Sequence, residues 1–163
     1  MSTQVIFLFG RPGVGKLTVG EHLTAELGYR LLHNHEALWH TSIEAALRAK
    51  VSGVIMTFAP EATVTDHFIP SLQKRVLAGM GTLHFIELQC TDKELEKRIS
   101  SEPRERFGKL RDVYKYRKLD EAGSFDRPAM PKPELVIDTT NLSPLDSARA
   151  IAKHLRQVST RPV

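Results

Sequence analysis

The stretch FLFGRPGVGKLTVGEHL, residues 7–23, decides the fold. Gly10, Gly15 and Lys16 match the phosphate-loop pattern G-x-x-x-x-G-K-[S/T] up to the last position, where Leu17 replaces the hydroxyl residue. The loop follows the continuous apolar run QVIFLF, residues 4–9, which is typical of a strand buried on both faces. A helical pattern then runs from Lys16 to the residue before Gly28. A phosphate loop requires this order of strand, glycine-rich turn and helix.

Apolar runs and helical patterns alternate along the rest of the chain. Further strands are expected at residues 29–33, 53–58, 82–90 and 134–140, and further helices at 35–50, 62–79, 91–100, 110–121 and 143–158. Strands that alternate with helices predict an α/β protein with a parallel sheet covered on both faces. The 163 residues show no repeat and no internal boundary, so we expect a single domain over 1–163.

Local signals refine three of these helices. Pro70 lies inside the 62–79 pattern and is expected to bend or split that helix. Thr91 and Glu94 have the spacing of a capping box at a helix start. Ser143 precedes Pro144 and is expected to be the N-cap of the last helix. Trp39 and Phe58 are expected in the core rather than in the wall of a substrate pocket.

The composition predicts a soluble cytoplasmic protein. Hydrophobic residues make up 41% of the chain and charged residues 26%, which is ordinary for a globular domain. No apolar run approaches the roughly 20 residues that cross a bilayer, so no membrane partner is expected. The single cysteine, Cys90, ends an apolar run, fits a reducing compartment and is interpreted as a buried structural thiol.

Positive charge is concentrated in one segment. The net charge is only +4, yet residues 93–118 contain ten Lys or Arg and five acids. Such a segment can bind an anion, either nucleic acid or a small phosphate compound. The segment has only Phe107, Tyr114 and Tyr116 as aromatic residues and no regular interleaving of aromatic with basic residues, so nucleic acid is not expected as a partner.

The glycine-rich loop has a direct physical role. Gly10, Gly13 and Gly15 allow backbone N–H groups to turn toward one point, where the helix N-terminus adds partial positive charge. Lys16 can then reach the β- and γ-phosphates of a nucleotide. The predicted nucleotide-binding residues of the loop are Gly10, Arg11, Pro12, Gly13, Val14, Gly15, Lys16, Leu17 and Thr18.

The loop, the small size and the closing stretch ELVIDTTNLSPLDSARAI resemble the small P-loop kinases, which include shikimate kinase, gluconate kinase and chloramphenicol phosphotransferase. GRPGVGKLTVGEHL together with YRLLHNH looks closer still to uncharacterised ATPases often described as shikimate kinase-like. The resemblance implies a five-stranded sheet of order 2-3-1-4-5 and ATP as the nucleotide. It also implies transfer of the γ-phosphate to a hydroxyl group of a small molecule.

The resemblance gives the basic segment a role. Arg98 matches the position that lies against adenine, and the loop after Asp138 is expected near the same base. Arg104 and Arg106 match the arginines of a lid, here about residues 102–112, which closes over the phosphates. Mobile guanidinium groups suit phosphoryl transfer because the reaction spreads negative charge over several oxygens.

The sequence departs from the family pattern at three places. Leu17 cannot ligate Mg²⁺, so the metal is expected to be held mainly through the phosphates and water. His33, Asn34 and His35 follow the second strand where shikimate kinase has an aspartate, and we expect them to bind the substrate, with His35 as a catalytic residue. The third strand ends at Thr57 without the usual acid.

A transition-metal site built from His33, His35 and His40 is disfavoured. The five-residue step from His35 to His40 suits a helical metal pair poorly, and no protein metal site is predicted.

Two functions remain open at the level of sequence. The first is an ATP-dependent small-molecule kinase in which Lys16, Arg104, Arg106 and His35 are catalytic. The second is a nucleotide-binding module or weak ATPase without efficient transfer, which Leu17 and the missing acids would favour. Only the kinase should release ADP faster when an acceptor is added.

Overall fold

The computed structural model describes residues 2–32, 36–101, 110, 112–126 and 128–159. The strands are β1 (Gln4–Phe9), β2 (Arg30–Leu32), β3 (Gly53–Phe58), β4 (Thr82–Gln89) and β5 (Leu135–Asp138). The helices are α1 (Lys16–Leu27), α2 (Glu36–Arg48), α3 (Phe68–Ala78), α4 (Asp92–Ile99), α5 (Val113–Glu121) and α6 (Pro144–Ser159). All strand pairs are parallel and the order is β2-β3-β1-β4-β5, as predicted.

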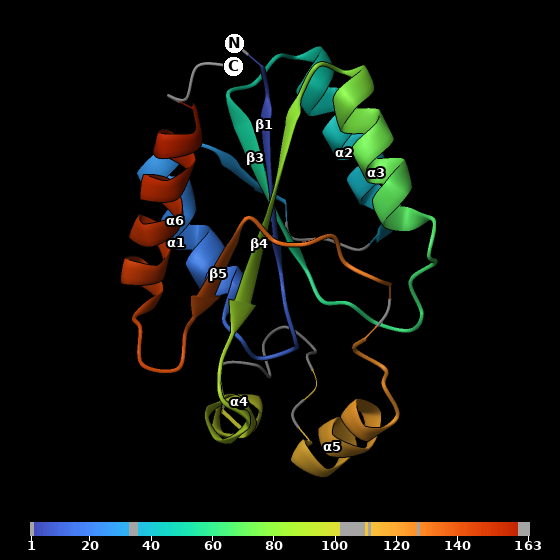
Figure 1. Ribbon diagram of the computed structural model, residues 1–163, viewed down its shortest axis with the longest axis vertical. Helices are drawn as coiled ribbons and strands as arrows, with labels where there is room; N and C mark the ends of the chain where they lie inside the picture. Colours follow the sequence, from blue (N-terminus) through green and yellow to red (C-terminus); the bar gives the residue numbers. More distant parts are fainter. Residues whose placement is uncertain (1, 33–35, 102–109, 111, 127, 160–163) are drawn as a thin grey trace.

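Helices cover both faces of the sheet, with α1 and α6 on one face and α2 and α3 on the other (Figure 1). Ile6 and Leu8 of β1 join a cluster with Leu23 of α1 and Ile151 of α6. The alternate residues of β1, such as Phe7, belong to a second cluster formed with α2 and α3. Successive side chains of a strand point to opposite faces, so a strand between two layers of helices must be apolar throughout. The unbroken run at residues 4–9 therefore reflects the central place of β1.

The strand register brings the phosphate loop to the edge at which ligands bind in such sheets. Phe9, the last residue of β1, lies between Phe58 of β3 and Glu87 of β4. The carboxyl ends of the strands therefore meet at one edge, and α4 and α5 lie beyond that edge (Figure 1). Open parallel sheets bind ligands there.

The helix that precedes β4 is shorter than predicted. It begins at Phe68 rather than at Ala62, and His67 is its N-cap. Pro70 consequently lies in the first turn, where a backbone N–H has no partner within the helix. The proline neither bends nor splits α3, and the expectation for residues 62–67 was wrong. Trp39 and Phe58 are both buried in the core, as expected.

The two predicted helix caps had different outcomes. Ser143 caps α6 as predicted, because its Oγ accepts a hydrogen bond from the N–H of Asp146 at 3.1 Å. Thr91 is the N-cap of α4, but its side chain makes no capping bond. The predicted capping box is therefore wrong, because Glu94 is hydrogen-bonded to Arg98 instead.

Other predicted elements were confirmed with small differences at their ends. The second, fourth and fifth strands are shorter than predicted, and α5 begins at Val113 rather than near residue 110. Among the described residues, none of the helices has both the length and the apolar character needed to span a membrane.

Candidate nucleotide-binding site

Positive backbone angles shape the loop between β1 and α1. Gly10, Gly13 and Gly15 have φ values of 146°, 100° and 96°. Only glycine adopts such angles without steric cost, so the three glycines are needed for this loop conformation. Val14 points inward between them and is 2% exposed, which anchors the loop to the core.

Gly10 also allows the loop to touch β4. A Cβ atom at this position would lie 2.2 Å from the carbonyl oxygen of Leu88. Real Cβ atoms do not approach a carbonyl oxygen so closely, so the contact requires glycine. The beginning of the phosphate loop is thus packed directly on the backbone of β4.

Lys16 lies across the loop that it follows in sequence. Its Nζ donates hydrogen bonds to the carbonyl oxygens of Gly10 at 2.6 Å and Arg11 at 2.9 Å. The ammonium group is thereby held over the same loop whose backbone would cradle phosphates. The first turn of α1 contains no acidic residue, so its positive end is not neutralised there by a carboxylate of that turn.

The described residues offer little to bind a metal directly. Leu17 has no oxygen in its side chain, and Thr18, the next residue, is exposed. Thr57, at the end of β3, is buried. No group of three or more His, Cys, Asp or Glu in the described part of the chain could hold a metal ion. These residues therefore do not fit a protein-ligated magnesium ion.

Arg98 of α4 lies beside the phosphate loop. Its Nη1 and Nη2 donate to the hydroxyl and carbonyl oxygens of Thr139, at 3.0 and 2.6 Å. Its Nε donates to Glu94 at 2.9 Å, and this hydrogen bond holds the pKa of Glu94 below its ordinary value. Nη1 lies 4.0 Å from the position that a Cβ atom of Gly15 would occupy. The guanidinium plane is thus fixed near the loop, and its contact with adenine stays a prediction.

Thr139 connects the parts of this site. It is 3% exposed, and its Oγ1 lies 3.0 Å from the carbonyl oxygens of both Val14 and Gln89. A hydroxyl has a single hydrogen to donate, which these two carbonyls share while Oγ1 accepts from Arg98. The phosphate loop, the end of β4 and α4 therefore meet at one buried side chain that sequence analysis did not identify.

We expect Thr139→Val to reduce the free energy of unfolding by about 1–3 kcal/mol, because buried partners lose a hydrogen bond. Urea unfolding of the wild type and the variant measures the change. Thr65→Val is the matched control, since Thr65 is exposed. A loss for Thr139→Val no larger than that of this control would contradict the role given to Thr139.

Asp138 shapes the turn after β5. Its Oδ1 accepts a hydrogen bond from the backbone N–H of Thr140 at 2.8 Å. Hydrogen bonds from Thr140 hold the pKa of Asp138 below its ordinary value. Thr140 Oγ1 in turn accepts from the N–H of Thr91, so this turn is joined to the start of α4.

The side chain of Arg11 leaves the phosphate loop toward the last helix before β5. Its Nη1 donates to Asp120 of α5 at 3.0 Å and lies 3.8 Å from Asp92 of α4. Arg11 was predicted to bind the nucleotide. Because its side chain is engaged with Asp120, only its backbone remains for contact with a nucleotide in the phosphate loop. No spacing in the sequence indicates this pairing, because the partners are 109 residues apart.

A cavity of about 520 Å³ adjoins the loop. Its lining comes from the phosphate loop, the end of β4 and the connection between α5 and β5, with Pro60 after β3 and Leu95 of α4 completing it. Cys90 lies in this lining, and burial raises the pKa of its thiol. The thiol is thus not activated as a nucleophile.

Five predicted site residues lie outside the described residues. They are His33, Asn34, His35, Arg104 and Arg106, and the predicted lid falls mostly outside as well. Their roles stay predictions.

The sheet order together with a glycine-rich loop and lysine after β1 defines the fold of the small P-loop kinases. The comparisons agree with this class, although no family model matches the chain. The chain is 27% identical over 116 residues to shikimate kinase 2 of Sodalis glossinidius, a stretch that covers 62% of this chain and 66% of that kinase. This relative confirms the resemblance to small P-loop kinases, at low sequence identity.

Solved structures show the same fold along almost the whole chain. A protein from Chloroflexus aurantiacus assigned as a kinase superposes with a TM-score of 0.69 at 19% identity, over 96% of this chain and 98% of that one. The APS kinase CysC of Mycobacterium tuberculosis, in complex with AMPPNP and APS, gives a TM-score of 0.60 at 15% identity over 95% of this chain and 98% of that one. Shikimate kinase of Acinetobacter baumannii, in complex with shikimate, gives 0.54 at 18% identity over 98% and 96%.

Proposed function

We propose that this protein is an ATP-dependent phosphotransferase that moves the γ-phosphate to a hydroxyl group of a small molecule. The observation that carries the proposal is the loop of residues 10–16, which three positive-φ glycines shape and on whose carbonyl oxygens the Lys16 ammonium group lies. Backbone N–H groups, a helix N-terminus and a lysine in this arrangement suit a nucleotide triphosphate. The likeness to shikimate kinase supports a small-molecule acceptor.

The proposed roles follow the path of the phosphoryl group. Lys16 and the loop amides bind the β- and γ-phosphates, and Arg98 lies against the adenine. Arg104 and Arg106, in a lid over about residues 102–112, neutralise the group in transfer. The acceptor oxygen forms a bond to the γ-phosphorus as the bond to the β–γ bridging oxygen breaks. ADP leaves, and the hydroxyl proton is released to water.

We propose that magnesium binds together with the nucleotide. The ion neutralises phosphate charge in this class of reaction. Because Leu17 cannot ligate it, we propose that the phosphates and water hold the ion.

A nucleotide-binding module or weak ATPase is the second candidate. Leu17 in the loop and Thr57 at the end of β3 favour it, since each replaces a group that positions magnesium in efficient enzymes. Release of ADP from ATP and Mg²⁺, measured with and without hydroxyl compounds, separates the two candidates. A kinase responds to its acceptor, and ³²P from the γ-position of ATP then appears in the product. ADP release that no acceptor increases would favour the module.

We expect Leu17→Ser to lower the magnesium concentration that supports half-maximal ADP release by about tenfold, because it restores a direct ligand. A magnesium titration at fixed ATP measures the change. Leu77→Ser is the control, since Leu77 is 71% exposed on α3, far from the loop in sequence. An unchanged magnesium dependence in Leu17→Ser would contradict the account of magnesium given above.

A further inference from the structure

The cavity beside the phosphate loop has a mixed polar and apolar lining, in which Glu87 is the acid that stands near the end of a strand. Phe9, Pro60, Phe125 and Met130 contribute apolar surface. Glu87 of β4 contributes a carboxylate and is partly buried. Ligand pockets of this size, roughly 300–1,000 Å³, are typically apolar with a few polar groups that set specificity. Glu87 is therefore the residue to examine.

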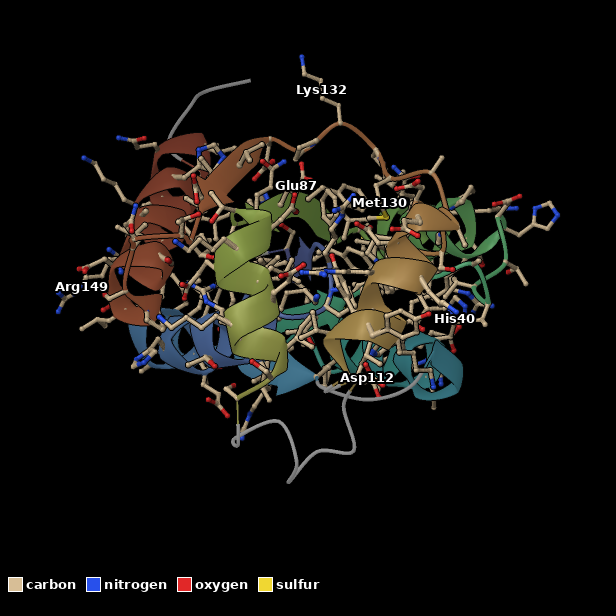
Figure 2. The ribbon with its side chains drawn as sticks, turned by 90° about the horizontal axis from the view of Figure 1, so that it is seen from below. His40, Glu87, Asp112, Met130, Lys132 and Arg149 are labelled. Atoms are coloured by element: carbon tan, nitrogen blue, oxygen red, sulfur yellow. The ribbon has the colours of Figure 1, made fainter. Side chains whose placement is uncertain are left out.

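The register of β4 explains why an acid reaches this cavity. Phe85 and Glu87 point to the same face of the sheet, and Phe85 is packed in the cluster formed with α2 and α3. Glu87 lies two residues closer to the carboxyl edge, level with Phe9, where the phosphate loop begins. The 122–133 connection runs past this part of the face, held by a hydrogen bond of 2.8 Å from Ala62 N–H to the carbonyl oxygen of Ser124. Figure 2 shows Glu87 between α4 and α5.

Within the described part of the chain, the side chain of Glu87 makes no hydrogen bond and no ion pair. Other acids near this edge differ, because Glu94 is bonded to Arg98, Glu96 to Arg117 and Asp120 to Arg11. A partly buried carboxylate without a partner is costly unless a ligand supplies one. Its position in the lining of a cavity supports a ligand as that partner.

The charges around the cavity favour a cation at Glu87. Arg11 lies in the lining, but its guanidinium group is paired with Asp120 and lies near Asp92. Lys132 also borders the cavity, yet its side chain projects away from the body of the protein (Figure 2). Asp126, which is exposed, adds a second negative charge at the cavity. Among the described lining residues, one cation is therefore paired and the other points outward, so neither supplies a counter-charge to Glu87.

We propose that this cavity binds the phosphoryl acceptor and that Glu87 binds a protonated amine of that acceptor. The acceptor class is a hydroxyl compound with an amino group, such as an amino sugar or an amino alcohol. Gly10 and Arg11 line the cavity and also belong to the phosphate loop, so a ligand held at Glu87 extends toward the phosphates. This inference rests on the proposed kinase function and names the substrate class for it.

This inference places the acceptor next to β4, whereas sequence analysis predicted an acceptor site after β2, on the opposite side of β1 in the sheet. His33, Asn34 and His35 follow β2, an edge strand, whereas Glu87 belongs to β4, the neighbour of β1 on the other side. A carboxylate-bearing acceptor such as shikimate would place like charges together at Glu87, which disfavours it. The two locations and the two charge types can be tested separately.

The test compares hydroxyl compounds that differ in charge. Ethanolamine, glucosamine and kanamycin are amines of increasing size, while glucose is neutral and gluconate is anionic. ADP release with ATP and Mg²⁺ gives kcat and KM for each compound. We expect at least one amine to stimulate release more strongly than glucose or gluconate. For that amine, Glu87→Gln should raise KM roughly 10- to 100-fold with little change in kcat, because a charge-assisted hydrogen bond is lost.

Two variants serve as comparisons. Asp66→Asn removes an exposed acid that is not in the cavity lining, and it should leave KM for the amine unchanged. His35→Ala tests the location after β2. If His35→Ala raises KM and Glu87→Gln does not, the proposed location is overturned. If Glu87→Gln instead lowers kcat at constant KM, Glu87 acts on the reacting hydroxyl and amine recognition is overturned.

Binding of ATP separates failure of this inference from failure of the kinase proposal. If ATP stabilises the wild type but no amine stimulates ADP release better than glucose or gluconate, the amine inference is overturned and nucleotide binding stands. Transfer of ³²P to glucose or gluconate would then support the kinase with a different acceptor class. If ATP does not stabilise the protein at all, both proposals are overturned.

Discussion

Lys16→Ala is expected to abolish the stabilisation of this protein by ATP and Mg²⁺. A ligand that binds only the native state at a hundred times its dissociation constant raises stability by about 2.7 kcal/mol. Lys16 supplies the only side-chain cation within the loop pattern that is predicted to reach the β- and γ-phosphates. Thermal unfolding of wild type and variant over an ATP titration measures the effect.

Controls separate a lost ligand contact from a damaged loop. Lys16 also bonds to the carbonyl oxygens of Gly10 and Arg11, so the melting temperature of the ligand-free variant must be recorded. Lys74→Ala removes an exposed lysine on α3 and should keep the full ATP response. An ATP response in Lys16→Ala equal to that of the wild type would show that the glycine loop is not the nucleotide site.

Gly10→Ala is expected to have the largest effect on stability among the variants considered. The new methyl group would lie 2.2 Å from the Leu88 carbonyl oxygen, and φ at this position is 146°. Overpacking against rigid backbone and strain at positive φ together predict a loss of about 2–5 kcal/mol. Because the loop must move away from β4 to relieve the contact, ATP binding should weaken as well. Urea unfolding and the ATP titration measure the two effects.

Gly28→Ala is the matched control for this variant. Gly28 also has a positive φ, 69°, but a Cβ there would meet nothing within 4 Å. Only backbone strain applies, so we expect a loss of about 1–2 kcal/mol and unchanged ATP binding. Equal losses in Gly10→Ala and Gly28→Ala would mean that the contact with Leu88 does not constrain the loop.

Local patterns in the sequence predicted most of the fold because they depend on near neighbours. The apolar run at 4–9, the glycines around Lys16 and the cap at Ser143 were confirmed as elements, and the family resemblance implied the strand order that the structure has. Errors arose where local signals compete. Residues 62–67 carry a helical pattern, yet α3 begins at Phe68, which places Pro70 in the first turn. Thr91 and Glu94 have capping-box spacing, but Arg98 binds Glu94.

The candidate site was only partly predictable. The sequence alone indicated the phosphate loop, since its residues are contiguous and their backbone angles follow from glycine. The roles of Arg104 and Arg106 came from the family resemblance, and those of His33, Asn34 and His35 from their chemistry at a position where the sequence departs from the family. All of them stay predictions. The loop after Asp138 was expected near the base, but the buried contacts of Thr139 and the place of Glu87 were not predicted, because a threonine in a turn and a glutamate in a strand carry no local signal.

What the sequence by itself determined about this protein is a parallel α/β sheet with a phosphate loop after the first strand, because periodicity and turn chemistry act within a few residues. Only the tertiary structure decided which distant groups meet. It joined Arg11 to Asp120 across 109 positions, placed Thr139 against Val14 across 125, and aligned Glu87 with Phe9. Such pairs depend on strand order and register. Both result from many weak interactions along the whole chain, so no single residue in the sequence predicts them.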